Sequence, residues 1–197
     1  MANNNAPNGF QYFGRLEGGS PTEGLTRNFI SSGDTNALGF GDPVVRLSGG
    51  YVTAASVSAS GIDGIFYGCT YVSTALQRQV WMNYLPGSAV ASGDITAYIC
   101  DDPEAQFVVQ SDNTAIAFSN TGLNIAMVLG TPNSTTQFST ASVGQSTIST
   151  TSTLPFRVIG LLSQSAPPGA NGTDNSSAFN RVIVAPNNWD RKNLTGI

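Results

Sequence analysis

The sequence contains no histidine, which removes the side chain that most often serves as a general base or a metal ligand. Neither a Ser–His–Asp nor a Cys–His catalytic arrangement can be built without it. Three acids, Asp101, Asp102 and Glu104, lie on one turn beside Pro103, whereas the carboxyl groups of a glycosidase face each other across the substrate. The same turn lacks the spacing of a calcium-binding loop. We therefore expect a non-enzymatic protein without catalytic, cofactor or metal sites.

Charged residues are also scarce, at 10% of the chain compared with roughly 25% in a typical soluble domain. Eight scattered basic and twelve acidic residues give a net charge of −4 and a sequence pI near 4.5. Nucleic-acid binding needs clustered cations, so we expect none. The sequence has no apolar run of about 20 residues, and its first residues lack the order of a signal peptide. We expect no membrane association, and synthesis in a cytoplasm.

Cysteine is limited to Cys69 and Cys100, both in apolar, strand-like runs. Two buried free thiols are the favoured interpretation. The alternative is a disulfide between adjacent strands.

Glycine, proline and aspartate recur at intervals too short for helices from Phe29 onward, and the segments between them are rich in β-branched and aromatic residues. This pattern predicts an all-β fold: a single jelly-roll-like β-barrel or β-sandwich over residues 29–185, followed by a tail over 186–197. Residues 74–84 also show a four-residue apolar spacing, but we favour a loop and a strand there. The single Trp189 of the tail either seals the core or marks a contact.

The stretch from Asp94 to Gln110 carries the clearest local signal, two alternating segments on either side of Asp101-Asp102-Pro103. Proline and the Asx side chains are typical of a turn. We predict a β-hairpin at the centre of the core, with the acids of its turn facing solvent or another subunit.

Residues 1–28 are expected to form an extended N-terminal arm, because aromatic residues follow a leader rich in asparagine, proline and glycine. Phe10, Tyr12, Phe13 and Arg15 are its candidate contact residues. Two interpretations stay open: the aromatics fold back onto their own core, or they dock on another subunit or a partner.

Residues 113–173 carry a single charge, and 131–153 are dominated by serine and threonine. This Ser/Thr-rich segment is either a disordered linker or, as we favour, an insertion packed against sister copies, because the lack of charge removes repulsion across a symmetry axis. Phe138 and Ile148 are its candidate subunit contacts.

Several spaced segments, taken together, resemble the capsid decoration (cement) proteins of tailed bacteriophages. They are Gly41-Asp-Pro-Val44, Gly61-Ile-Asp-Gly-Ile-Phe-Tyr-Gly-Cys-Thr-Tyr71, Asn83-Tyr-Leu-Pro-Gly87, Ala97 to Gln110, Phe156-Arg-Val-Ile-Gly160 and the leader Met1 to Phe10. The resemblance covers residues 1–112 and 154–185, whereas the Ser/Thr-rich segment departs from it.

The resemblance implies a homotrimer on the outer surface of the virion that binds the major capsid protein and locks its neighbours together. One alternative is a carbohydrate- or host-surface-binding head fibre or adhesin, which exposed aromatics such as Tyr51, Tyr71 or Trp81 on one face would favour. Another is a head–tail joining protein, present in fewer copies.

Overall fold

The computed structural model describes residues 3–18, 24–57, 59, 61–87, 91–162 and 174–192. The regular elements in this part are strands and three short 3₁₀ turns, η1 (Phe118–Asn120), η2 (Gln145–Thr147) and η3 (Asp190–Lys192). The all-β prediction is therefore confirmed. None of the described helical turns has the length and apolar character needed to cross a membrane.

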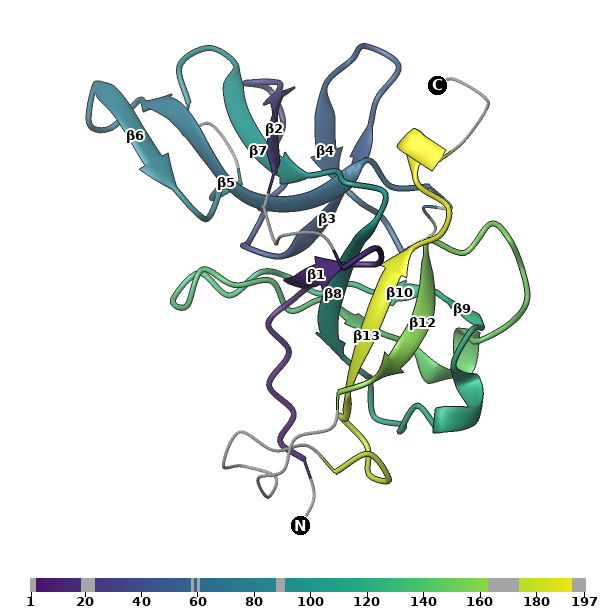
Figure 1. The fold of residues 1–197 in the computed structure, drawn as a ribbon. Coiled ribbons are helices and arrows are strands. Elements are labelled where there is room, and N and C mark those ends of the chain that lie inside the picture. Colours follow the sequence, from purple (N-terminus) through teal and green to yellow (C-terminus); the bar gives the residue numbers. More distant parts are fainter. Residues whose placement is uncertain are drawn as a thin grey trace.

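A five-stranded antiparallel sheet forms the lower part of the molecule in Figure 1. Its order is β1 (Gln11–Arg15), β8 (Ala105–Gln110), β13 (Arg181–Pro186), β12 (Phe156–Leu161) and β9 (Asn124–Ile125). A separate two-stranded ladder joins β10 (Met127–Val128) to β11 (Ser142–Val143).

A six-stranded antiparallel sheet forms the upper part (Figure 1). Its order is β2 (Leu25–Ile30), β7 (Ile95–Cys100), β5 (Gly64–Ser73), β3 (Asp42–Arg46) and β4 (Val52–Ala54), and β6 (Arg78–Met82) pairs with the far half of β5. β6 falls within residues 74–84, so the strand favoured over a helix there is confirmed.

The six-stranded sheet curls until its two edge strands, β2 and β4, contact each other. No ladder joins them in the described residues. Side chains bridge this seam, because Arg46 Nη2 donates to Asn28 Oδ1 at 2.7 Å and binds the carboxylate of Asp63 at 2.5 Å. Of the two predicted architectures, the β-sandwich agrees with the structure, and a closed barrel does not.

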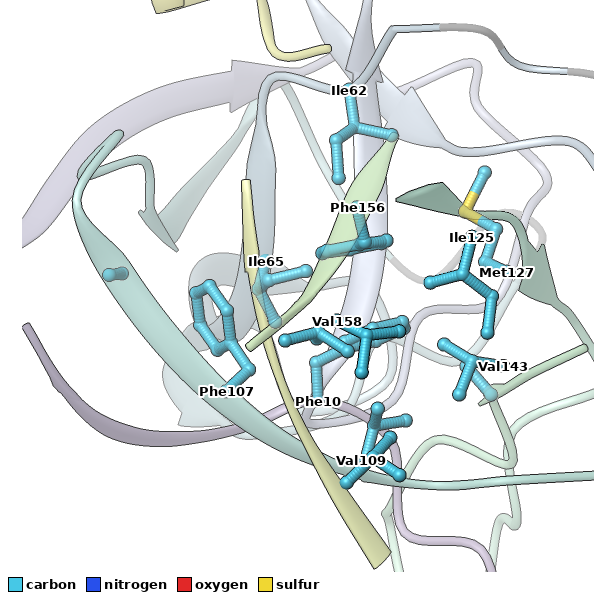
Figure 2. Close-up of a cluster of buried hydrophobic side chains, with 14 of the residues drawn as sticks. Phe10, Ile62, Ile65, Phe107, Val109, Ile125, Met127, Val143, Phe156 and Val158 are labelled. Atoms are coloured by element: carbon cyan, nitrogen blue, oxygen red, sulfur yellow. The ribbon is translucent and has the colours of Figure 1, made fainter. Parts of the chain in front are cut away.

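Two hydrophobic clusters follow from the alternation of the strands. One lies inside the curl of the six-stranded sheet and includes Phe66, Cys69 and Tyr71 of β5. The larger one lies against the five-stranded sheet, where Phe107 and Phe156 pack with Phe10 and Ile62 of the loops (Figure 2). Trp189 belongs to the same cluster. Trp189 is fully buried, so the interpretation that it seals the core is confirmed.

The two cysteines lie apart, and both are buried thiols outside any disulfide, as the favoured interpretation expected. On β5 and β7, Cys69 pairs with Ala97, whereas Cys100 pairs with Ile65. Burial raises the pKa of the Cys69 thiol to about 12.

The predicted central hairpin is wrong, although both of its strands exist. β7 pairs with β2 and β5 in the six-stranded sheet, whereas β8 pairs with β1 and β13 in the five-stranded sheet. The turn at residues 101–104 therefore carries the chain from one sheet to the other. Local alternation revealed the strands but held no information about their partners.

The acids of this turn bind cations of their own chain. Asp101 is buried, pairs with Arg191 and accepts a hydrogen bond from Thr26 Oγ1 at 2.8 Å. Asp102 Oδ2 lies 2.8 Å from Arg15 Nε. The expectation that the turn's acids face solvent or another subunit is thus wrong for Asp101, whereas Asp102 stays partly exposed. The two ion pairs tie Arg15 and Arg191 to the junction of the sheets.

The expected N-terminal arm is extended over residues 3–10 but contributes two of its described segments, β1 and the first part of β2, to the sheets. β1 pairs with β8, and β2 pairs with β7. The expected domain boundary at residues 28 and 29 falls inside β2. β2 alternates outward and inward side chains across that boundary, and strand pairing, not composition, fixes its extent.

The Ser/Thr-rich segment packs on its own chain and is not a free linker. Ala141 and Val143 are fully buried, and Ser139 Oγ donates to Asp42 Oδ1 at 2.5 Å. Hydroxyl groups here satisfy backbone and carboxylate partners, which explains how a segment poor in charge and in large apolar residues is fixed.

Candidate binding surface

An exposed aromatic surface covers the outer side of β2, β7, β5 and β6. Residues that share this side through the strand registers form what we call the aromatic face: Arg27, Phe29, Gly68, Thr70, Val72, Gln79, Trp81, Thr96 and Tyr98. Phe29 and Trp81 are 52% and 56% exposed, and Val72 is exposed as well. Large apolar side chains therefore lie together on the solvent-exposed side of the sheet and not in the core.

Trp81 owes its position to a glycine on the neighbouring strand. A Cβ atom at Gly68 would lie 2.7 Å from Trp81 Cζ2, so only a glycine lets the indole ring lie over β5. The ring then meets Tyr98 of β7 edge to face, with centroids 4.9 Å apart and planes at 60°. Such pairs contribute about 0.5–1.5 kcal/mol beyond their buried area, which holds the two rings as one unit.

Phe29 and Trp81 lie on one row that crosses the face. The strand registers place Phe29 opposite Thr96, Thr96 opposite Thr70, and Thr70 opposite Trp81. Three strand spacings put the Cα atoms of the two aromatics about 14 Å apart. The two threonines between them have smaller and more polar side chains than the aromatic residues at its ends, so the centre of the row is recessed and polar.

Arg27 is the charged residue of the aromatic face. It lies opposite Tyr98 in the register and is exposed. Among the outward residues of the four strands that the structure describes, none is acidic. Arginine, tyrosine and tryptophan are the residue types most enriched among interface hot spots, and here they are neighbours.

The arm residues that were expected to contact a partner differ in whether they are buried or exposed. Phe10 is fully buried and stacks on Phe156, so it is not available for such a contact. The Tyr12 ring packs edge to face on Phe107, and its backbone N–H donates to Tyr67 Oη at 2.8 Å. For these two aromatics, the interpretation that they fold back onto their own core is confirmed.

Phe13 is displayed, unlike its neighbours. It is the extra residue of a β-bulge, because Tyr12 pairs with Phe107 and Gly14 with Gln106. A bulge redirects a side chain, and Phe13 is 50% exposed at the free edge of the five-stranded sheet. The guanidinium group of Arg15, by contrast, already forms an ion pair with Asp102.

The two candidates of the Ser/Thr-rich segment also differ. Phe138 is 37% exposed and meets Phe40 edge to face, with centroids 5.6 Å apart. Ile148 is half-buried against the larger core cluster. Phe138 is therefore the better placed of the two for a subunit contact.

The three aromatics that would favour an adhesin do not share one face. Tyr71 is buried inside the curl, where its hydroxyl donates to Met82 Sδ at 3.3 Å. Tyr51 lies at the seam, and its hydroxyl donates to Asp94 Oδ2 at 2.8 Å. Trp81 alone of the three belongs to the aromatic face.

The most strongly perturbed buried acid lies away from this face. Asp42 accepts hydrogen bonds from the Gly39 N–H at 2.7 Å and from Ser139 Oγ. Burial nevertheless raises its pKa to about 6, because desolvation of the carboxylate outweighs both hydrogen bonds. Within the described residues, no three His, Cys, Asp or Glu side chains group as metal ligands.

Sequence reasoning missed Arg27, Phe29 and Tyr98. The available signal was the alternation of residues 25–30, in which the odd-numbered side chains face outward. It was obscured because Phe29 and Ile30 are both large and apolar, so the pattern does not say which of them is inside. Comparisons with protein-family models, curated proteins and solved structures found no significant match to this chain.

Proposed function

We propose that this chain is a non-enzymatic capsid decoration protein that binds the outside of a bacteriophage head through its aromatic face. The resemblance of the sequence to capsid decoration proteins of tailed bacteriophages suggests the phage head as its binding partner. The observation that carries the proposal is the cluster of exposed Trp81 and Arg27 with half-buried Tyr98 on a paired sheet, where none of the described outward residues within the four strands is acidic.

The expected occupant of the face is the major capsid protein, through a surface that combines apolar and acidic groups. Trp81 and Phe29 supply buried apolar area, at about 25 cal/mol per Å² removed from water. Arg27 would pair with a carboxylate, which also orients the contact. The sheet beneath is fixed by ladders on both sides of β7, so binding costs little conformational entropy.

A trimer would multiply this contact. Three linked copies bind a lattice of capsid proteins more strongly than one copy, because the second and third contacts are intramolecular. We propose that the subunit contact is at the Ser/Thr-rich segment around Phe138, which is partly exposed in a nearly uncharged stretch of sequence. Mass photometry of the purified chain at micromolar concentration is expected to give three times 20.5 kDa, and a monomer alone would contradict the trimer.

Binding to heads prepared without the protein tests the proposal. Wild-type chain is expected to saturate the heads in many copies, whereas Trp81→Ala and Arg27→Ala lower the affinity at least tenfold. Phe118→Ala is the matched control, because Phe118 is 77% exposed in η1, outside the aromatic face. It should bind as wild type does.

The outcomes separate the alternatives. Absence of wild-type binding to heads would contradict the decoration function itself. Full binding by both face variants would keep the function but move the contact elsewhere, with Phe13 as the next candidate. A few copies at a single vertex would indicate a head–tail joining protein.

A further inference from the structure

A shallow pocket opens at the seam of the six-stranded sheet, where β2 meets the connection between β3 and β4. Its volume is about 300 Å³. The residues that line this seam pocket are Phe29, Gly49, Gly50, Tyr51 and Asp94. In the described residues no backbone ladder joins β2 to β4 at this seam, and the pocket lies in the opening between them.

Asp94 is held in place at the pocket by its own chain. Its Oδ2 accepts the hydrogen bond from Tyr51 Oη at 2.8 Å, and its Oδ1 accepts one from the Ser32 N–H at 3.3 Å. The hydrogen bond and the charge of Asp94 raise the pKa of Tyr51, which keeps the phenol protonated. Each carboxylate oxygen has a further lone pair, so Asp94 can still accept a hydroxyl from a ligand.

The other walls are aromatic or bare backbone. The exposed ring of Phe29 and the half-buried ring of Tyr51 offer flat apolar surfaces. Gly50 has a φ of +84° and would have no neighbour within 4 Å of a Cβ atom. A ligand can therefore approach the backbone at Gly50 without meeting a side chain there.

A second hollow, with a volume of about 440 Å³, shares Tyr51 with the seam pocket. Its lining is rich in hydroxyl, amide and carboxylate groups: Ser31, Gly33, Asp34, Asn36, Leu47, Tyr51, Val52 and Thr53. Asn36 Nδ2 donates to Asp34 Oδ1 at 2.8 Å and to Thr53 Oγ1 at 3.1 Å, which fixes these polar groups as one array. Tyr51 thus lines two neighbouring subsites.

We propose that the seam pocket and this second hollow bind a neutral oligosaccharide. One sugar ring lies with its C–H face against Phe29 and Tyr51 and donates hydroxyl hydrogens to Asp94. The next ring contacts the polar array around Asn36. A few fixed polar groups beside aromatic walls are the usual composition of a small-molecule site, and the carboxylates disfavour acidic sugars.

The site shares Phe29 with the capsid contact but uses none of Trp81, Tyr98 or Arg27, so variants of these three residues distinguish glycan binding from capsid binding. The test applies the full chain to an array of neutral and acidic glycans that includes bacterial surface polysaccharides. The best neutral glycan is then titrated by calorimetry against wild type and variants. Asp94→Asn and Tyr51→Ala are expected to weaken binding at least tenfold, and Trp81→Ala and Phe118→Ala to leave it within twofold.

Two results would overturn the proposal. One is the absence of saturable binding to any neutral glycan on the array, whether or not acidic glycans bind. The other is wild-type affinity in both Asp94→Asn and Tyr51→Ala. Choline is included as a cationic probe, because an aromatic pair beside a carboxylate also suits a quaternary ammonium group. Binding of choline without any neutral glycan would assign the pocket to cations instead. Asp94 is exposed, so its variant is expected to fold and keeps the test decisive if Tyr51→Ala does not.

Discussion

Phe10 stacks on Phe156 with ring centroids 4.4 Å apart and planes at 12°. The first aromatic of the N-terminal segment is thereby built into the centre of the larger core cluster, beside Phe107 (Figure 2). Three residues further on, Phe13 points away from that core. Two phenylalanines so close in sequence therefore have opposite roles, one in folding and one at the surface.

This contrast gives the first prediction. Phe10→Ala should lower the free energy of unfolding by about 3–5 kcal/mol, because it leaves a cavity among packed rings. Phe13→Ala should change it by no more than about 0.5 kcal/mol, because half of the side chain is already exposed. Urea unfolding followed by tryptophan fluorescence, in which buried Trp189 reports on the core, measures both. Equal losses in the two variants would contradict the placement of Phe13 at the surface.

Asp42 gives a prediction on pH. Burial raises its pKa from 3.8 to about 6 in the folded protein, so folding is favoured while the group is protonated. The stabilisation is complete below about pH 4, the unfolded value, and is lost as the pH rises through about 6. The full span corresponds to about 3 kcal/mol.

Asp42→Asn should remove this dependence. The stability of the variant relative to wild type is expected to increase between pH 4 and pH 7, by an amount of up to about 3 kcal/mol. Urea unfolding at several pH values measures it. Glu17→Gln, at an exposed position, corrects for the loss of one negative charge. Parallel profiles for Asp42→Asn and wild type would show that the carboxylate is not desolvated as described.

Much of the fold was predictable because strand formation is a local property. Alternation and β-branched residues located β7, β8, β12 and β13 from the sequence alone. The pairing of those strands was not predictable, because it depends on which faces meet in three dimensions. The two halves of the stretch from Asp94 to Gln110 separated into different sheets for that reason.

The aromatic face was harder to predict from the sequence than the strands were. Trp81 was recognisable as an aromatic on a short strand, but its exposure depends on Gly68, which is 13 positions earlier in the chain and becomes its neighbour only through the ladder between β5 and β6. The seam pocket depends in the same way on the curl of the sheet, which brings Tyr51 to Asp94.

The pairing of Arg191 with Asp101 gives a third prediction. Asp101 is buried, so removal of its cation by Arg191→Met leaves a carboxylate with one remaining hydrogen bond, from Thr26. We expect a loss of about 1–3 kcal/mol, since Arg191 itself is half exposed and water can replace part of the interaction. Thermal unfolding at low and high salt measures it.

The double variant Arg191→Met with Asp101→Asn supplies the control for this pair. It should recover part of the loss, because the buried negative charge is gone. A double variant as unstable as the sum of the two single variants would show that the pair contributes nothing.

Gly68 gives the last prediction. In Gly68→Ala the new methyl group would lie 2.7 Å from Trp81 Cζ2 and 3.1 Å from the Met82 carbonyl oxygen. The indole ring is 56% exposed and can swing outward, so we expect a modest cost of about 1 kcal/mol, together with loss of its contact with Tyr98. Acrylamide quenching of tryptophan fluorescence should increase, and head binding should fall as in Trp81→Ala.

Gly160→Ala is the matched control, because a Cβ atom at Gly160 of β12 would meet nothing within 4 Å. It should leave both quenching and binding unchanged. Unchanged quenching in Gly68→Ala would mean that the indole does not lie over β5. A change in quenching with wild-type head binding would separate the position of Trp81 from the capsid contact, and would leave Arg27 and Phe29 to carry it.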